Sequence, residues 1–154
     1  MPNLESHEAV AIRNQVVLDE LTAHLEHRFT EFAPWVISVA FYKALHLVEG
    51  ILFIDGIHSR ERRPIHSQDH TERKNILRRN RYANLWKHYR PLYEASMVAR
   101  YLCDTSGTGN SLEFSEKYIK DSSTLNTLIG HHLHQIQRTF DERKSAYKPV
   151  TDTK

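Results

Sequence analysis

Hydrophobic positions along the first part of the chain recur every three or four residues, which is the spacing of an amphipathic helix. Ser6 precedes this pattern, and serine is a favoured residue at the N-cap of a helix. We therefore expect a first helix from about His7 to His27, with Ser6 as its N-cap. Its expected apolar stripe consists of Val10, Val17, Leu21 and Leu25.

A second and more hydrophobic helix is expected from Pro34 to just before Gly56. Proline suits the first helical position, and glycine readily adopts the left-handed conformation that follows a helix. Polar residues interrupt the apolar stretch from Phe32 to Phe53, so the pattern predicts a central core helix without a membrane role. Its two stripes are Trp35, Val39, Tyr42, His46 and Glu49, and Phe41, Leu45, Val48 and Leu52.

The segment from Gly56 to Gln68 has no periodicity and is expected to be a loop. Asp69 and Glu72 have the spacing of a capping box, which predicts a short third helix ending near Asn80. A fourth helix is expected from Ala83 to Cys103, with a potential break at Pro91. Its inward residues are expected to be Leu85, Tyr89, Leu92, Ser96 and Ala99 or Arg100.

A loop from Asp104 to Ser111 and a short helical piece from Leu112 to Lys120 lead to a last helix from Ser122 to Ser145. The stripe of this last helix is Leu125, Leu128, Leu133, Ile136 and Phe140. Together these patterns predict an all-α fold, a four- to five-helix up-and-down bundle. We expect one domain over residues 1–146, followed by a flexible C-terminal tail over residues 147–154.

The composition fits one soluble globular domain, because 40% of the 154 residues are hydrophobic and 26% are charged. Cys103 is the only cysteine, which excludes an intramolecular disulfide and a four-cysteine zinc site. Acidic residues appear early in the chain without an apolar run, so no signal peptide is expected. These features predict a cytoplasmic location.

Positive charge is concentrated in one part of the chain. Residues 58–90 contain ten lysines and arginines against three acidic residues, although the net charge of the whole chain is only +2. Such a segment is either a solvated helix face or a surface for a phosphate-bearing partner such as RNA. Aromatic residues that could stack on unpaired bases, Tyr82 and Trp86, interleave with the expected RNA contacts. These contacts are Arg78, Arg79, Arg81 and Lys87.

Histidines and arginines in the same segment could cleave RNA without a metal. Imidazoles in general titrate near neutrality, so His66 or His70 could take a proton from a ribose 2′-hydroxyl. Arg73, Arg63 and Arg60 could stabilise charge on the scissile phosphate.

Two other interpretations of this segment remain open. His66, Asp69 and His70 could bind a divalent metal together with His58 or another histidine, since histidines four residues apart share a helix face. Alternatively, these residues only cap and solvate a helix.

A second polar set lies on the two central helices and consists of Tyr42, His46, Ser96 and Arg100. Buried polar groups need partners, so we expect Arg100 to bond Tyr42, His46 or Glu49 in a core polar network. A third set, His131, His132 and His134, is expected to spread around a helix instead of converging.

Two of these helices carry patterns that resemble the HEPN superfamily of small helical bundles. Phe41 to His46 matches Phe-Tyr-x-Ala-Leu-His, and Tyr89 to Tyr101 matches Tyr-x-x-Leu-x-x-x-Ser-x-x-Ala-Arg-Tyr. The resemblance extends from about Ala9 to Phe140. It implies a HEPN-like bundle of a kind that often dimerises. Many members are metal-independent ribonucleases in toxin–antitoxin, phage-defence or RNA-processing systems. Other members are noncatalytic binding modules.

The chain lacks the Arg-Asn-x-x-x-His string that is typical of the family nucleases. Looser spacings pair Arg60 with His66, Arg63 with His70, and Arg81 with His88, but about three such pairs are expected by chance.

The sequence therefore favours an RNA-binding HEPN-like homodimer that is a candidate metal-independent endoribonuclease. No metal or cofactor is expected for this function, and the expected partners are RNA, a second copy, and a cognate antitoxin or defence-system protein. The first alternative is a noncatalytic module that binds nucleic acid or protein. The second is a metal-dependent helical-bundle hydrolase.

Overall fold

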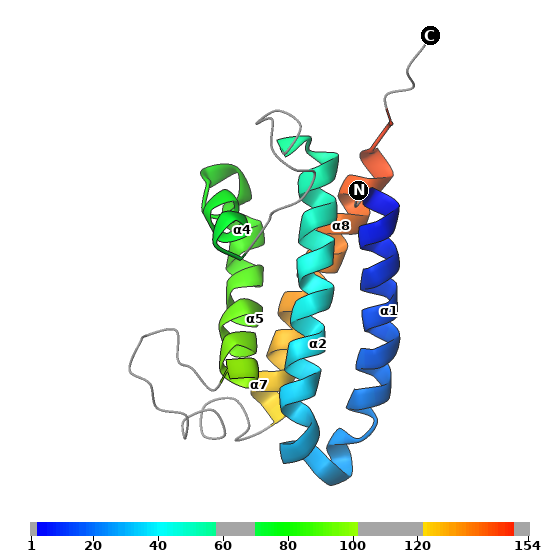
Figure 1. The fold of residues 1–154 in the computed structure, drawn as a ribbon, viewed down its shortest axis with the longest axis vertical. Helices are drawn as coiled ribbons and strands as arrows, with labels where there is room; N and C mark the ends of the chain where they lie inside the picture. The colour runs from blue at the N-terminus through cyan, green and yellow to red at the C-terminus, as the bar shows by residue number, and fades with distance from the viewer. Residues whose placement is uncertain (1–2, 58–69, 102–121, 150–154) are drawn as a thin grey trace.

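The computed structural model describes residues 3–57, 70–101 and 122–149, and every regular element in these ranges is a helix (Figure 1). The all-α prediction is therefore confirmed. The elements are α1 (Leu4–Thr22), α2 (Leu25–Ile54), α4 (His70–Leu77), the 3₁₀ turn η1 (Asn80–Tyr82), α5 (Ala83–Tyr101), α7 (Ser122–Asn126), the π-helical η2 (Thr127–Leu133) and α8 (His134–Ala146).

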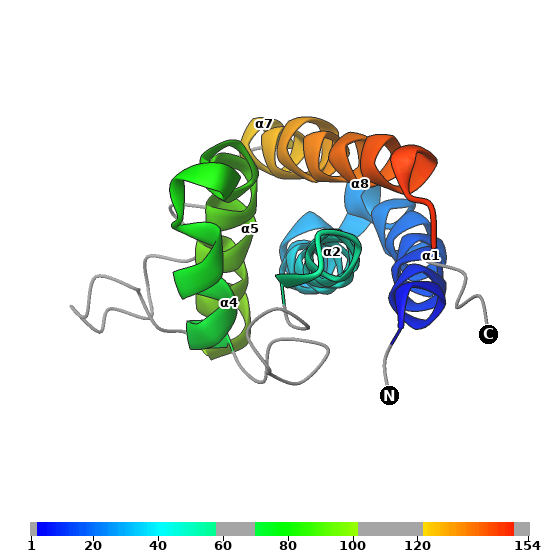
Figure 2. The same cartoon turned by 90° about the horizontal axis from the view of Figure 1, so that it is seen from above.

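The long helices run alternately up and down. In Figure 1, α1 descends, α2 ascends, α5 descends, and α7, η2 and α8 ascend as one continuous rod. Seen from above, α2 lies at the centre, with α1 on one side, α5 on the other and α8 behind it (Figure 2). This arrangement explains why most of α2 is buried, as its broad apolar face predicts.

The first helix begins earlier than its apolar pattern suggests. Asn3 is the N-cap, because its side chain accepts hydrogen bonds from both the backbone N–H and the hydroxyl of Ser6. Ser6 thus lies inside α1, and the expectation that it caps the helix is wrong. The expected stripe is also rotated: Val17 is 45% exposed, whereas His7, Ala11 and Leu18 are buried.

The second helix begins at Leu25 and continues through Pro34. Its only non-helical backbone is at Arg28, where φ is −140° and ψ is 50°. Pro34 therefore does not mark the first turn, and the kink lies two turns before it. The end of α2 is as expected, since Gly56 follows the C-cap with a positive φ of 66°.

Helix α5 is continuous past Pro91, so the potential break is absent. Its expected inward residues Leu85, Tyr89, Leu92 and Ser96 are all buried. The expected loop around Pro64, the Asp69 cap, the Asp104 loop and the piece from Leu112 to Lys120 fall on residues outside the described ranges.

The stripe of the last helix is confirmed, because all five of its expected members are buried. The helix is not uniform, however, since residues from Thr127 to Leu133 are π-helical. A π-helical stretch has a wider turn than an α-helix and is rare in proteins. It changes the directions in which His131 and His132 project.

One helix in the described part of the chain, α2, is long and apolar enough to cross a membrane by length and composition alone. In its most apolar window 67% of the residues are buried inside the bundle, which is also typical of the core helix of a soluble protein.

Candidate functional site

A polar network joins the two helices that carry the family-like patterns. The Arg100 guanidinium on α5 donates a 2.9 Å hydrogen bond to the Tyr42 hydroxyl on α2, and its planar group lies 5.1 Å from the centre of the Phe41 ring. Ser96 is fully buried and lies one turn from Arg100, at the edge of hydrogen-bond distance. The expected pairing of Arg100 with Tyr42 is therefore present.

His46 belongs to a different pair. Its Nδ1 lies 3.2 Å from Nδ1 of His7 on α1, an arrangement in which one ring donates and the other accepts. Partial burial, followed by the positive charges that His7 and Arg73 can carry, lowers the pKa of His46 to about 4. His46 is consequently neutral near pH 7. It contacts His7 on α1 and does not join Tyr42, Ser96 and Arg100, with which the sequence pattern grouped it.

Arg73 is buried, whereas the sequence predicts it on a surface that binds phosphate. The residue is only 4% exposed, and its Nε donates a 2.6 Å hydrogen bond to the Glu49 carboxylate, which is buried on α2. A buried arginine that is paired with a carboxylate does not face solvent, where a phosphate would bind. The expectation that Arg73 stabilises a scissile phosphate therefore does not fit this geometry.

His70 lies beside this ion pair. Its Nδ1 is 3.2 Å from a guanidinium nitrogen of Arg73, and its ring packs between the rings of Phe41 and Tyr93 at centroid distances of 5.5 and 5.9 Å. His70 and Arg73 are thus close together, as their spacing predicts, but both are directed toward the bundle. The other catalytic candidates, His66, Arg63 and Arg60, lie outside the described residues.

The Tyr89 hydroxyl is buried in the same region, and no hydrogen bond of normal geometry reaches it within the described ranges. Burial raises the pKa of Tyr89 to about 12, although the nearby Arg73 charge opposes this effect. The phenol is accordingly protonated and uncharged at neutral pH.

A single carboxylate anchors the basic end of the bundle. Asp55, at the C-cap of α2, accepts a 2.8 Å hydrogen bond from the Tyr82 hydroxyl. Two arginines also reach it: Arg81 at 3.3 Å and Arg143, on α8, at 2.9 Å. Burial and the bond to Asp55 raise the pKa of Tyr82. Because two cations share one carboxylate, this end of the molecule retains positive charge.

The predicted RNA contacts lie on the surface next to this carboxylate. Residues 70–90 contain seven lysines and arginines against one acidic residue. Within them, four exposed basic residues follow the end of α4, η1 and the first turns of α5, and we call them the basic surface: Arg78, Arg79, Arg81 and Lys87. Arg81 also lies over the Tyr82 ring at 5.4 Å.

The aromatic part of this prediction is only partly present. Tyr82 is buried at 3% exposure, and Trp86 is half-buried against Tyr89 at a centroid distance of 6.3 Å. Neither ring is therefore fully available for stacking on a base.

A cluster that the sequence interpretation missed brings together His88, His131 and His132. Nδ1 of His88, on α5, lies 3.1 Å from Nδ1 of His132, and the three ring centroids are 4.9 to 5.4 Å apart. Burial, followed by the nearby histidines, lowers the pKa of both His88 and His132. His131 and His132 therefore converge, contrary to expectation.

No protein-family model, curated protein or solved structure matches the chain.

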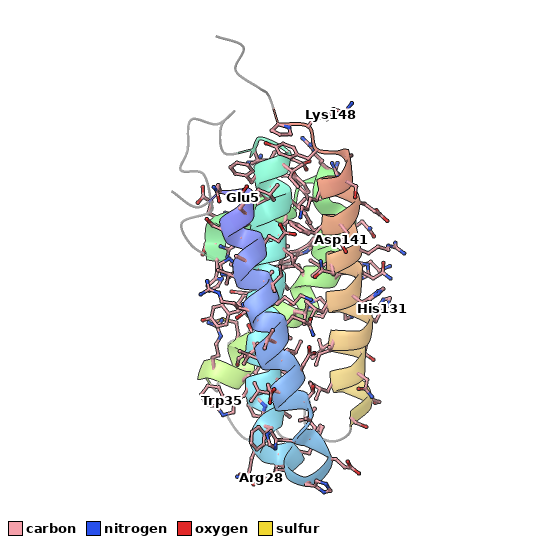
Figure 3. The ribbon with its side chains drawn as sticks, turned by 90° about the vertical axis from the view of Figure 1, so that its right-hand side faces the viewer. Glu5, Arg28, Trp35, His131, Asp141 and Lys148 are labelled. Atoms are coloured by element: carbon pink, nitrogen blue, oxygen red, sulfur yellow. The ribbon has the colours of Figure 1, made fainter. Side chains whose placement is uncertain are left out.

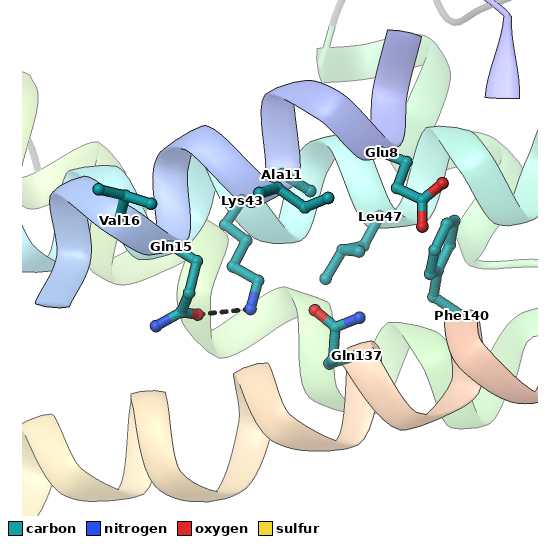
Figure 4. A pocket seen from close by; sticks show the side chains of 9 residues that line it. Glu8, Ala11, Gln15, Val16, Lys43, Leu47, Gln137 and Phe140 are labelled. Carbon is teal, nitrogen blue, oxygen red and sulfur yellow. Dashed lines mark hydrogen bonds between the residues drawn. The ribbon is translucent and has the colours of Figure 1, made fainter. Parts of the chain in front are cut away.

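A separate groove lies between α1, α2 and α8 (Figure 4). In Figure 2, α4 and α5 lie on the opposite side of α2 from α1. It has a volume of about 220 Å³ and an apolar lining that includes Ile12, Val16 and Phe140. The buried Lys43 donates a 2.6 Å hydrogen bond to the Gln15 side chain within it, and burial lowers the pKa of this lysine. Glu8, which also lines the groove, is engaged by Lys144 on α8.

Proposed function

We propose that the protein is a HEPN-like homodimer that binds RNA through its basic surface. The exposed run of Arg78, Arg79, Arg81 and Lys87 is the observation that carries this proposal, because clustered basic side chains attract the phosphate backbone. Asp55 neutralises only part of the charge at this end of the bundle, since it is shared between Arg81 and Arg143.

The described residues favour binding over cleavage. Arg73 is held by Glu49, and His70 packs against two aromatic rings, so neither presents a free reacting group at the surface. A noncatalytic RNA-binding module is therefore the form of the proposal that the geometry supports best. Incubation with mixed RNA tests this point: intact RNA agrees with it, and cleavage that survives a chelator identifies a metal-independent ribonuclease instead.

Removing charge from the basic surface is expected to weaken RNA binding. The double variant Arg78→Gln and Lys87→Gln should lower the affinity for single-stranded RNA about tenfold or more, because two phosphate contacts are lost. The slope of log affinity against log salt concentration should fall by about one for each residue. Fluorescence anisotropy with labelled RNA over a salt series measures both quantities.

Arg28→Gln is the matched control, because Arg28 is an exposed arginine near the opposite end of the bundle (Figure 3). Its replacement should leave both affinity and salt slope unchanged. An equal loss in this variant would show that RNA responds only to net charge, and undetectable binding by the unaltered protein would remove the proposal.

Self-association is proposed through an exposed face of α2. Trp35 is 65% exposed and Tyr42 is 40% exposed, and Val39 lies between them on the same face. Figure 3 shows Trp35 on the side opposite to His131 and Asp141. Large exposed aromatic residues on a core helix are typical of an interface, and the family-like patterns on α2 and α5 favour a second copy as the partner.

Trp35→Glu is expected to shift this homodimer to monomer, because the interface would then bury an unpaired carboxylate. Sedimentation-velocity centrifugation over a range of concentrations measures the change. Val16→Glu is the control, since Val16 is an apolar residue on α1 with a similar exposure of 60%. A monomeric unaltered protein, or dimers of both variants, would contradict this interface.

A further inference from the structure

The three-histidine cluster is assembled from two elements that are distant in sequence. His88 comes from the second turn of α5, whereas His131 and His132 are consecutive residues in the π-helical η2. Their exposure is graded, since His88 is buried, His132 is intermediate and His131 is exposed. The cluster therefore has a fixed inner side and an outer side that solvent can reach.

Its nitrogen atoms are spaced as metal ligands require. One ring nitrogen from each histidine can be chosen so that all three lie within 4.8 Å of one another. A tetrahedral zinc ion with bonds of about 2.0–2.1 Å holds two nitrogen ligands about 3.3–3.4 Å apart. The observed 3.1 Å between Nδ1 of His88 and Nδ1 of His132 is close to this separation. The chosen His131 nitrogen lies within 4.8 Å of the other two, and rotation of its side chain would have to bring it to the same separation.

The π-helical stretch explains how the consecutive residues His131 and His132 can both contact His88. On an α-helix, consecutive side chains diverge and do not face each other. A wider turn contains more residues and reduces the rotation between neighbours, so His131 and His132 point in more similar directions. Short π-helical stretches occur frequently at functional sites, where they redirect side chains.

We propose that His88, His131 and His132 form a binding site for Zn²⁺ with an open fourth position. Imidazole is a favoured ligand of zinc, and three histidines with one open position are a known coordination set for this ion. The two Nδ1 atoms that now face each other would both present lone pairs to the metal, with their protons on Nε2. The exposed side of His131 leaves the fourth position to water.

The surroundings set the expected strength of the site. Lys87 and Arg138 lie near enough to influence the histidines electrostatically, and their positive charges oppose a bound cation. The site should therefore bind only metals that have a high intrinsic affinity for imidazole. We expect Cu²⁺ to bind more tightly than Zn²⁺, and we expect no retention of Mg²⁺ or Ca²⁺. This proposal departs from the sequence expectation that no metal is bound.

The adjoining surface offers room for a small ligand of the metal. His132 also lines a hollow of about 300 Å³ between α5 and the α7–η2 segment. Its other lining residues include the hydroxyl-bearing Ser123, Thr124 and Thr127 and the carboxylate of Glu94. Glu94 is engaged by Arg90 at 2.7 Å, so it is not counted as a ligand.

Isothermal titration of the protein with ZnCl₂ tests the site, and the protein must lack a histidine tag because a tag binds the same ion. The expected result is saturable binding of one Zn²⁺ per chain, with a rise in melting temperature. His131→Ala should weaken the affinity about tenfold or more, since it removes one of three ligands. His131 is exposed, so its replacement is expected to leave the fold intact.

His134→Ala is the matched control, because His134 is an exposed histidine of the same rod but lies outside the cluster. Its zinc affinity should equal that of the unaltered protein, whereas His88→Asn should weaken binding as His131→Ala does. Visible absorption of the Co²⁺-loaded protein should show the intense bands of tetrahedral coordination. Absence of saturable binding, or equal losses in His134→Ala and His131→Ala, would overturn the proposal.

Discussion

Replacing Glu49 with alanine is expected to lower the free energy of unfolding by about 3–5 kcal/mol, because it leaves the Arg73 charge buried without its carboxylate. Glu49 and Arg73 are among the most completely buried charged residues in the described part of the chain. Their 2.6 Å bond also holds α4 against α2. Urea denaturation followed by circular dichroism measures the loss.

The double variant Glu49→Met and Arg73→Met is the informative companion. Replacing both members of a buried ion pair with apolar residues of similar size is often neutral or stabilising, since no charge then remains buried. We expect it to recover most of the stability that Glu49→Ala loses. A cost below about 1 kcal/mol for Glu49→Ala would show that Arg73 finds solvent or another partner when the carboxylate is removed.

Replacing Gly50 with valine is expected to destabilise the bundle by about 3 kcal/mol, at the upper end of the usual cost of overpacking a core. A Cβ at this position would lie 2.6 Å from Cε2 of Phe140 and 3.5 Å from a methyl group of Leu4. Phe140 is itself buried, so its ring has little room to move aside. The melting temperature of the variant measures the effect.

Phe140→Leu supplies the control for this contact. The smaller side chain should relieve part of the clash, so the double variant should be more stable than the sum of the two separate losses predicts. If the losses of stability in the two single variants add up to the loss in the double variant, the destabilisation by Gly50→Val does not come from a specific contact with Phe140. Gly130→Val is a second comparison, because a Cβ at Gly130 meets no atom within 4 Å.

The helical fold could be predicted from the sequence because periodicity reports directly on which face is buried. The last helix shows this most clearly, since each expected stripe residue from Leu125 to Phe140 lies in the core. Boundaries were less accurate. Serine and asparagine both cap helices, and nothing in the pattern distinguishes Asn3 from Ser6 as the first residue to bond the free N–H groups.

The polar residues were harder to place because their partners are distant in sequence. The sequence around Arg73 is rich in basic residues, which is typical of a phosphate-binding surface. In the structure, however, Arg73 is buried in the bundle because it pairs with Glu49, which lies 24 residues earlier in the chain. A stronger signal was available from the second helix, where Glu49 falls on the same stripe as His46 and therefore needs a buried cation. Arg100 was predicted better, because Tyr42 lies on the facing stripe.

The histidine cluster could not be predicted from helical spacing, since that spacing assumes an α-helix. Both His131 and His132 meet His88 at a place where their own helix is π-helical and packs against α5. Neither the wider turn nor the crossing point leaves a recognisable pattern in the sequence. The sequence shows only that His131 and His132 are adjacent, and this indicates no more than that two imidazoles could contact the same third residue.

The order of the helices along the chain also has a kinetic consequence. Helix α1 packs on α2, its immediate neighbour in sequence, so these two can pair at a small cost in loop-closure entropy. Helix α8 packs on the same central helix from about 90 residues away, as the contact between Gly50 and Phe140 shows. The α1–α2 hairpin is thus favoured as the early folding nucleus, with docking of α8 as the step that closes the bundle.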